Sequence, residues 1–140
     1  MRYVVPVGRA MLAAFFLKAV PELFQEKTIA FVSEQGIPLA GVFVPLAGFL
    51  ALTGGISILL GWRARLGAWL LVALLVPATL LMHPFWAVSD AATAAIQEAT
   101  FYRNLAMIGG MLLIAYFGAG PFSMDARKPE PAFHEVRQAA

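Results

Sequence analysis

Cysteine is absent from this sequence and charged residues are scarce, and each shortage excludes a class of protein. The 140 residues contain no cysteine, which excludes disulfides, thiolate nucleophiles and cysteine-ligated iron–sulfur or zinc centres. Charged residues make up only 13% of the chain, against roughly 25% in soluble domains. The net charge of +2 is too small to indicate a nucleic-acid partner. A soluble, thiol-dependent or nucleic-acid-binding protein is therefore not expected.

Long apolar runs take up most of the chain, since 61% of its residues are hydrophobic. The runs cover residues 4–23, 39–60, 66–82 and 101–122. A helix needs about 20 residues to cross about 30 Å of hydrocarbon. The sequence therefore predicts an all-α membrane protein, a four-transmembrane-helix bundle over residues 1–125. Residues 126–140 are polar and are predicted to form a flexible cytoplasmic tail.

The stretches between the runs predict two further short helices. One covers residues 26–35 and lies on the membrane surface. The other covers residues 91–98, is capped by Ser89 or Asp90, and continues into the fourth run.

Lysine and arginine gather at one end of the predicted bundle, and this bias predicts its orientation. Seven of them flank the start of the first run, the second-to-third loop and the tail: Arg2, Arg9, Arg63, Arg65, Arg127, Lys128 and Arg137. Three lie at the other end: Lys18, Lys27 and Arg103. Both termini are therefore predicted in the cytoplasm, in a plasma (inner) membrane of bacterial type. Arg9 and Lys18 also interrupt the first run, so it is not expected to be a cleaved signal peptide.

A short motif occurs twice, as Leu-Ala-x-x-Gly-Gly at residues 50–55 and again at residues 105–110. Both copies lie in runs that cross in the same direction. This predicts two helix hairpins related by a pseudo-two-fold axis along the membrane normal. Small residues let helices approach closely in lipid, so all four glycines of the motif are expected to face neighbouring helices.

Polar residues inside or beside the runs mark a candidate ligand-binding site at the outer end of the bundle. Ionisable groups within a span are costly and usually functional. The candidate residues are Lys18, Glu22, His83, Trp86, Arg103 and Asn104. They are expected to converge in one pocket, since a bundle interior can satisfy such groups and lipid cannot.

Each of these residues also has a plainer interpretation. Lys18 can extend its side chain towards the interface, and Glu22 can simply lie there. A single histidine before a proline, such as His83, is usually an interfacial residue. Asn104 can serve interhelical hydrogen bonding. Taken together, the two cations and two outward helix N-termini favour a small anion or a quinone carbonyl. No metal site is predicted, and a quinone is the candidate cofactor.

The sequence resembles the DoxX family of small four-helix membrane proteins. The matching segments are residues 8–10 (Gly-Arg-Ala), 54–65, 83–86 (His-Pro-Phe-Trp), 104–110 and 118–125. The resemblance implies a non-catalytic membrane subunit or accessory protein of a quinone-linked redox complex. Two alternatives stay open: the membrane half of a thiosulfate:quinone oxidoreductase, and a small transporter. The expected partners are the lipid bilayer, membrane or peripheral redox proteins, and a second copy of the chain.

Overall fold

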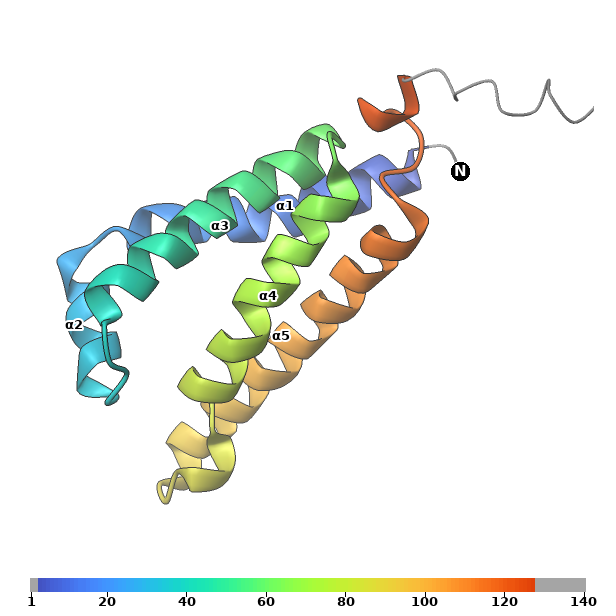
Figure 1. The fold of residues 1–140 in the computed structure, drawn as a ribbon. Coiled ribbons are helices and arrows are strands. Elements are labelled where there is room, and N and C mark those ends of the chain that lie inside the picture. The colour runs from blue at the N-terminus through green and yellow to red at the C-terminus, as the bar shows by residue number, and fades with distance from the viewer. Residues whose placement is uncertain (1–2, 128–140) are drawn as a thin grey trace, which may run out of the picture.

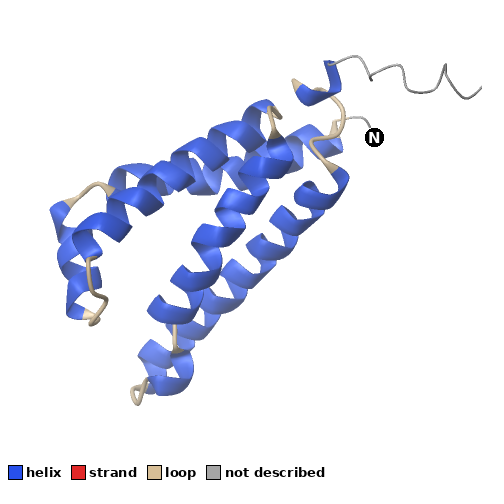
Figure 2. Ribbon diagram, viewed as in Figure 1, coloured by secondary structure: helices blue, strands red, loops and turns tan. Residues whose placement is uncertain are grey.

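The computed structural model describes residues 3–127, and this part of the chain is helical (Figure 2). Its five α-helices and two short 3-10 helices are α1 (Val4–Leu23), α2 (Glu26–Glu34), α3 (Ala40–Leu60), α4 (Ala64–Met82), η1 (Phe85–Ala87), α5 (Ala91–Phe117) and η2 (Asp125–Arg127). The tail predicted for residues 126–140 lies outside the described residues, except for Ala126 and Arg127 in η2. The all-α prediction is confirmed.

Three of the described helices are long and apolar enough to cross a membrane. They are α1, α3 and the segment Ala64–Ala87, which contains α4. Helix α5 has 27 residues but carries Glu98 and Arg103 in its first half, which lowers its hydropathy. The predicted membrane protein is thus supported by three spans, and α5 as a fourth span stays a prediction.

The helices form two hairpins that meet at one end and separate at the other (Figure 1). Hairpin 1 consists of α1, α2 and α3; hairpin 2 consists of α4, η1 and α5. Within each hairpin the long helices pack side by side, and α3 packs on α4 to join the two. We call the meeting end, where the α3–α4 turn and residues 118–127 lie, the closed end. The end that carries α2 and η1 is the open end.

Local signals explain where several helices begin and end. The Asp90 carboxylate accepts a hydrogen bond from Thr93 N at 2.8 Å, which confirms Asp90 as the cap of α5. Helix α3 ends at Gly61, whose φ of +64° is a left-handed conformation that suits glycine. Helix α5 ends before Gly118, at φ +84°, so it ends five residues earlier than the predicted run, which extended to residue 122.

The repeated glycines do not share one environment. A Cβ added to Gly54 would lie 2.7 Å from Leu71 Cγ on α4, and one on Gly55 would lie 2.9 Å from Leu17 Cδ2 on α1. A Cβ added to Gly110 would lie 3.3 Å from Leu12 Cδ1 on α1, but a Cβ on Gly109 would meet nothing within 4 Å. The prediction that all four glycines face neighbouring helices is therefore wrong for Gly109. The reason is that α3 packs between two helices, whereas α5 packs mainly along α4.

Candidate functional site

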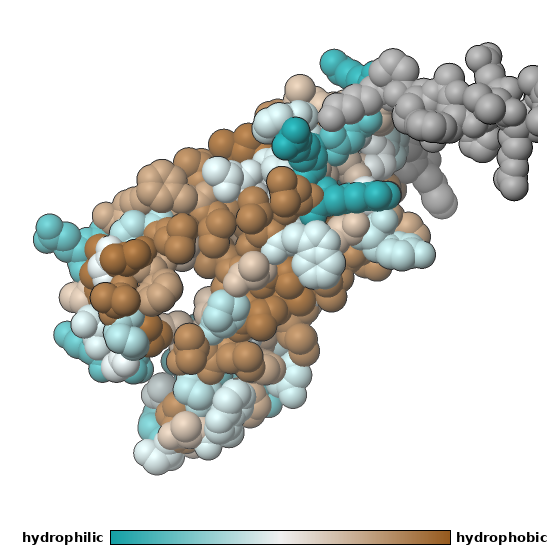
Figure 3. All heavy atoms as spheres, in the orientation of Figure 1, coloured by the Kyte–Doolittle hydropathy of each residue, from teal (hydrophilic) through white to brown (hydrophobic). Residues whose placement is uncertain are grey.

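The open end of the molecule is split by an opening between the two hairpins. The space-filling view shows this opening, with apolar surface on both sides of it (Figure 3). The buried core lies further towards the closed end, where Ala13, Ile58, Leu71 and Met111 are almost fully enclosed. The opening therefore begins where close packing between the hairpins stops.

Asn104 lies on the inward face of α5, midway along the helix. This face carries Asn104, Met107, Met111 and Ile114 as its buried residues, and the three apolar ones belong to the core. Asn104 is only 4% exposed, yet its amide has no hydrogen-bond partner within the described part of the chain. Arg9 Nε is the one fully enclosed side-chain atom without a partner among these residues, so the Asn104 amide must border open space.

Arg103 projects from α5 towards α1 on the outside of the bundle. Its Cζ lies 5.3 Å from the centroid of the Phe15 ring on α1, a cation–π arrangement. Lys18 and Glu22 follow Phe15 at intervals of three and seven residues, so they lie on the same face of α1. Both are exposed, and no ion pair joins them in the described structure. Two cations thus flank the edge where α1 meets α5.

His83 ends α4 and is bound to α5. Its Nδ1 lies 2.5 Å from Gln97 Oε1. An amide oxygen only accepts, so Nδ1 is the donor in this hydrogen bond. Trp86, 60% exposed, packs edge-on against Phe85 and Phe101 at centroid distances of 5.1 and 5.8 Å. This aromatic cluster covers the tip of hairpin 2.

The six predicted site residues therefore form three groups at the open end. Asn104 faces the interior, Arg103 joins the face of α1 that carries Lys18 and Glu22, and His83 and Trp86 lie at the tip of hairpin 2. Within residues 3–127, no hydrogen bond or ion pair joins any two of the six.

Sequence reasoning missed a second polar centre, at the closed end. Arg9 is 4% exposed and donates hydrogen bonds to the carbonyl oxygens of Ala119 and, at 3.1 Å, of Phe122. The sequence offered a signal, because an arginine in the second turn of an apolar helix needs partners. Those partners are backbone carbonyls more than 100 residues away, which no residue pattern identifies.

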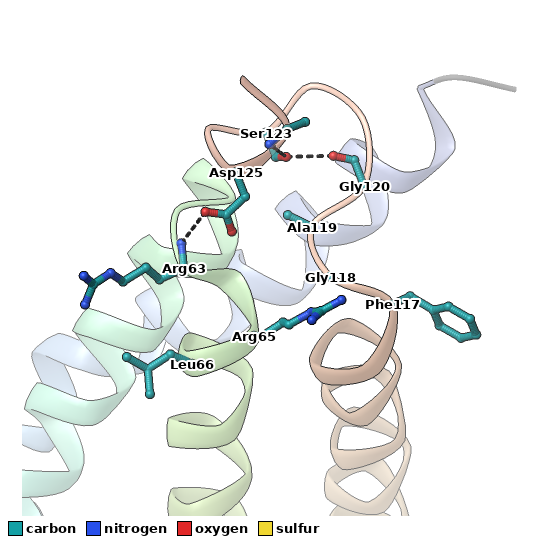
Figure 4. A pocket seen from close by; sticks show the side chains of 10 residues that line it. Arg63, Arg65, Leu66, Phe117, Gly118, Ala119, Gly120, Ser123 and Asp125 are labelled. Carbon is teal, nitrogen blue, oxygen red and sulfur yellow. Dashed lines mark hydrogen bonds between the residues drawn. The ribbon is translucent and has the colours of Figure 1, made fainter. Parts of the chain in front are cut away.

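Asp125 completes this centre by capping α4. Its two carboxylate oxygens accept hydrogen bonds from Arg63 N and Ala64 N, at 2.8 and 2.9 Å. Its own N–H donates to Gly61 O at 2.9 Å. Residues 118–127 are thus bound across the closed end, beside a cleft that Arg65 and Phe117 also line (Figure 4).

Within residues 3–127, no group of three or more histidine, aspartate or glutamate side chains could hold a metal ion. The open end carries an amide, two cations, an imidazole and aromatic rings.

Comparison with known proteins gives relatives of two kinds. The chain is 31% identical over 134 residues to a Surfeit locus protein 4 homologue of Drosophila melanogaster, which covers 86% of this chain and 48% of that protein. A homologue in Schizosaccharomyces pombe is 29% identical over 84 residues, 59% of this chain and 28% of that protein. The chain thus spans half or less of the length of these relatives. The inner membrane protein YqjF of Escherichia coli is 30% identical over 98 residues, 70% of this chain and 69% of that protein. No solved structure matches.

The family comparison overturns the resemblance to DoxX. The family model that matches this sequence is that of the SURF4 family, over residues 29–130. The segments attributed to DoxX are short and rich in glycine, alanine and interfacial aromatic residues, which are common in many helical membrane proteins. The quinone-linked redox complex, which that resemblance implied, loses its support. The match covers well over half of the chain, and the protein is therefore a membrane protein that belongs to the SURF4 family.

Proposed function

We propose that this protein binds an amphipathic molecule from the bilayer in the opening between its two hairpins. One observation carries the proposal: the Asn104 amide is buried at mid-depth, borders open space and lacks a partner in the described residues. An unpaired buried amide costs about 1–3 kcal/mol, and a ligand with a polar head would remove that cost.

The residues around the opening indicate which ligand chemistry fits. The Asn104 amide can donate to a carbonyl or hydroxyl oxygen and accept from a hydroxyl. Arg103 and Lys18 favour a head group that is polar or anionic. The apolar surfaces of both hairpins would hold an alkyl or ring-bearing tail. A quinone has this combination of carbonyls and tail, and it is one ligand in the proposed class.

The proposed setting is an inner membrane, with α5 as the fourth span and both termini in the cytoplasm. The name of the relative YqjF describes an inner membrane protein of Escherichia coli. Cysteine labelling tests the orientation cleanly, because the chain has no cysteine of its own. A cysteine at Ser89 should react with an impermeant reagent from outside, and one at Ala126 should not. The reverse pattern would contradict this orientation.

Ligand binding is tested by replacing Asn104 with leucine, which has nearly the same size and no hydrogen-bonding groups. The full chain is purified in mild detergent, its bound small molecules are identified by mass spectrometry, and a decyl benzoquinone is titrated as a probe. Asn104→Leu should weaken retention of a polar-headed ligand by about fivefold to tenfold, the loss of one neutral hydrogen bond. Thr53→Val is the matched control, because the Thr53 hydroxyl bonds only to carbonyls of its own helix.

The same variant separates an occupied opening from an empty one. If nothing binds there, Asn104→Leu removes an unpaired polar group and should raise the melting temperature. Equal ligand retention in wild type and variant, together with a higher melting temperature, would refute the proposal.

A further inference from the structure

The closed end holds a cleft that the proposed function does not use. Its volume is about 560 Å³, within the range of about 300–1,000 Å³ typical of ligand pockets. The first turn of α4 forms one wall, and the segment that follows α5 forms the other (Figure 4). The cleft lies at the level where the apolar helices end, which is where lipid head groups meet water.

Arg65 is the cation available to a ligand in this cleft. Its guanidinium lies against Gly118, where an added Cβ would be 3.5 Å from Arg65 Nε. Arg65 is exposed and has no hydrogen bond or ion pair within residues 3–127. Figure 4 shows its side chain directed towards Gly118 and Phe117, whereas that of Arg63 points away from them. The five N–H donors of Arg65 therefore have no acceptor within residues 3–127.

The carboxylate in the cleft does not neutralise this arginine. Both oxygens of Asp125 accept hydrogen bonds from the first backbone N–H groups of α4. The Asp125 charge is thus directed at the helix terminus, where it offsets the positive end of the helix dipole. Arg65 keeps its charge for another partner.

The side of the cleft towards the hydrocarbon is apolar. Leu66 and Phe117 line it and are 54% and 72% exposed, and Trp69, one turn further along α4, is 55% exposed. A soluble anion would make no use of these surfaces. A molecule with an anionic head at Arg65 and alkyl chains along Leu66 and Phe117 would use both halves of the cleft.

We infer that this cleft binds the phosphate head group of an anionic glycerophospholipid from the leaflet at the closed end. Arginine suits phosphate because its planar fork can donate two parallel hydrogen bonds. Basic pockets between helices on the cytoplasmic side are a recurrent place for such head groups. The Ser123 hydroxyl donates to Gly120 O at 2.7 Å and accepts from Ala126 N at 3.1 Å, so it holds the wall of the cleft opposite Arg65 in place.

The test compares lipids retained by the full chain in nanodiscs of equimolar phosphatidylglycerol and phosphatidylcholine. Native mass spectrometry should find phosphatidylglycerol enriched on the wild-type protein. Arg65→Gln should lower that enrichment by about tenfold, as expected for a charge-assisted hydrogen bond. Lys27→Gln, the same change of charge on α2 at the open end, should leave the enrichment unchanged. Equal enrichment in Arg65→Gln and wild type would overturn the inference.

Two measurements on the wild-type protein complete the test and need no variant to fold. Phosphatidylglycerol, compared with phosphatidylcholine alone, should protect Arg65 from phenylglyoxal. Equal modification of Arg65 in both lipids would overturn the inference. Inorganic phosphate, added to phosphatidylcholine nanodiscs, should not protect Arg65. If it does so as well as phosphatidylglycerol, the site binds a soluble phosphate and the lipid assignment fails.

Discussion

The polar groups at the two ends of this protein have different kinds of partner. At the closed end, Arg9 and Asp125 bind backbone groups of distant segments, so their polarity stabilises the fold. At the open end, Asn104 has no partner among the described residues and Arg103 contacts a phenylalanine ring. The difference shows that a polar residue in a span indicates function only after its partners have been identified.

The largest effect is expected from breaking the closed end at Arg9. Arg9→Ala removes the two charge-assisted hydrogen bonds that the guanidinium donates to the Ala119 and Phe122 carbonyls. We expect a loss of about 3 kcal/mol in the free energy of unfolding. Chemical denaturation in detergent measures it, with Arg103→Ala as the control at the open end. If Arg103→Ala lost more free energy of unfolding than Arg9→Ala, the open end would stabilise the fold more than the closed end, contrary to this comparison.

A second test concerns the two glycines that share one place in the repeated motif. Gly54→Leu should cost about 1–3 kcal/mol, because Leu71 of α4 leaves no space for a larger residue. Gly109→Leu should leave the melting temperature nearly unchanged, since that position is open. Thermal unfolding of both variants in the same detergent measures the two effects. Equal losses would show that Gly109 also faces a helix.

The cap on α4 gives a smaller effect. Asp125→Ala removes the acceptor for Arg63 N and Ala64 N and should destabilise the protein by about 0.5–2 kcal/mol. Asp125→Asn keeps one acceptor oxygen and should lose less. Hydrogen exchange should locate the change at the start of α4. If exchange rose instead at the open end, the two ends would not be independent.

The smallest expected effect is a pH dependence at the open end. The Thr93 hydroxyl and backbone N–H hold the pKa of Asp90 below its ordinary value. A carboxyl whose folded pKa is lowered stabilises the protein above its unfolded pKa of about 3.9, and this contribution is lost as the pH falls through the folded pKa. Between neutral pH and about pH 3, the melting temperature should therefore fall more in wild type than in Asp90→Ala. If the melting temperatures of the two proteins fell equally over this pH range, the Asp90 cap would not contribute to stability.

Much of the fold could be predicted from the sequence because helix length and ends are local properties. The run at residues 4–23 has the bounds of α1, and the runs before and after the α3–α4 turn agree with α3 and α4 within two residues. The prediction placed the start of α4 two residues late because its cap, Asp125, lies about 60 residues further along the chain. Such a cap can be recognised only in three dimensions.

For the candidate site, the sequence identified polar residues but not their partners. His83 was predicted as part of a site, and Gln97, which binds it, was not noticed. Arg9 was taken as a flanking charge, although it is the most buried arginine described. Spacing along one helix shows which residues share a face, but it does not show which other helix that face meets.

The sequence by itself determined that this is a helical membrane protein, because the length and apolar content of a run fix whether a helix can span the bilayer. Only the tertiary structure decided which side of each helix is buried. Two copies of one motif lie on different faces, Gly54 against α4 and Gly109 in the open. The physical reason is that the rotation of a helix about its axis depends on contacts with all its neighbours at once, and in lipid those contacts depend on packing rather than on hydrophobicity.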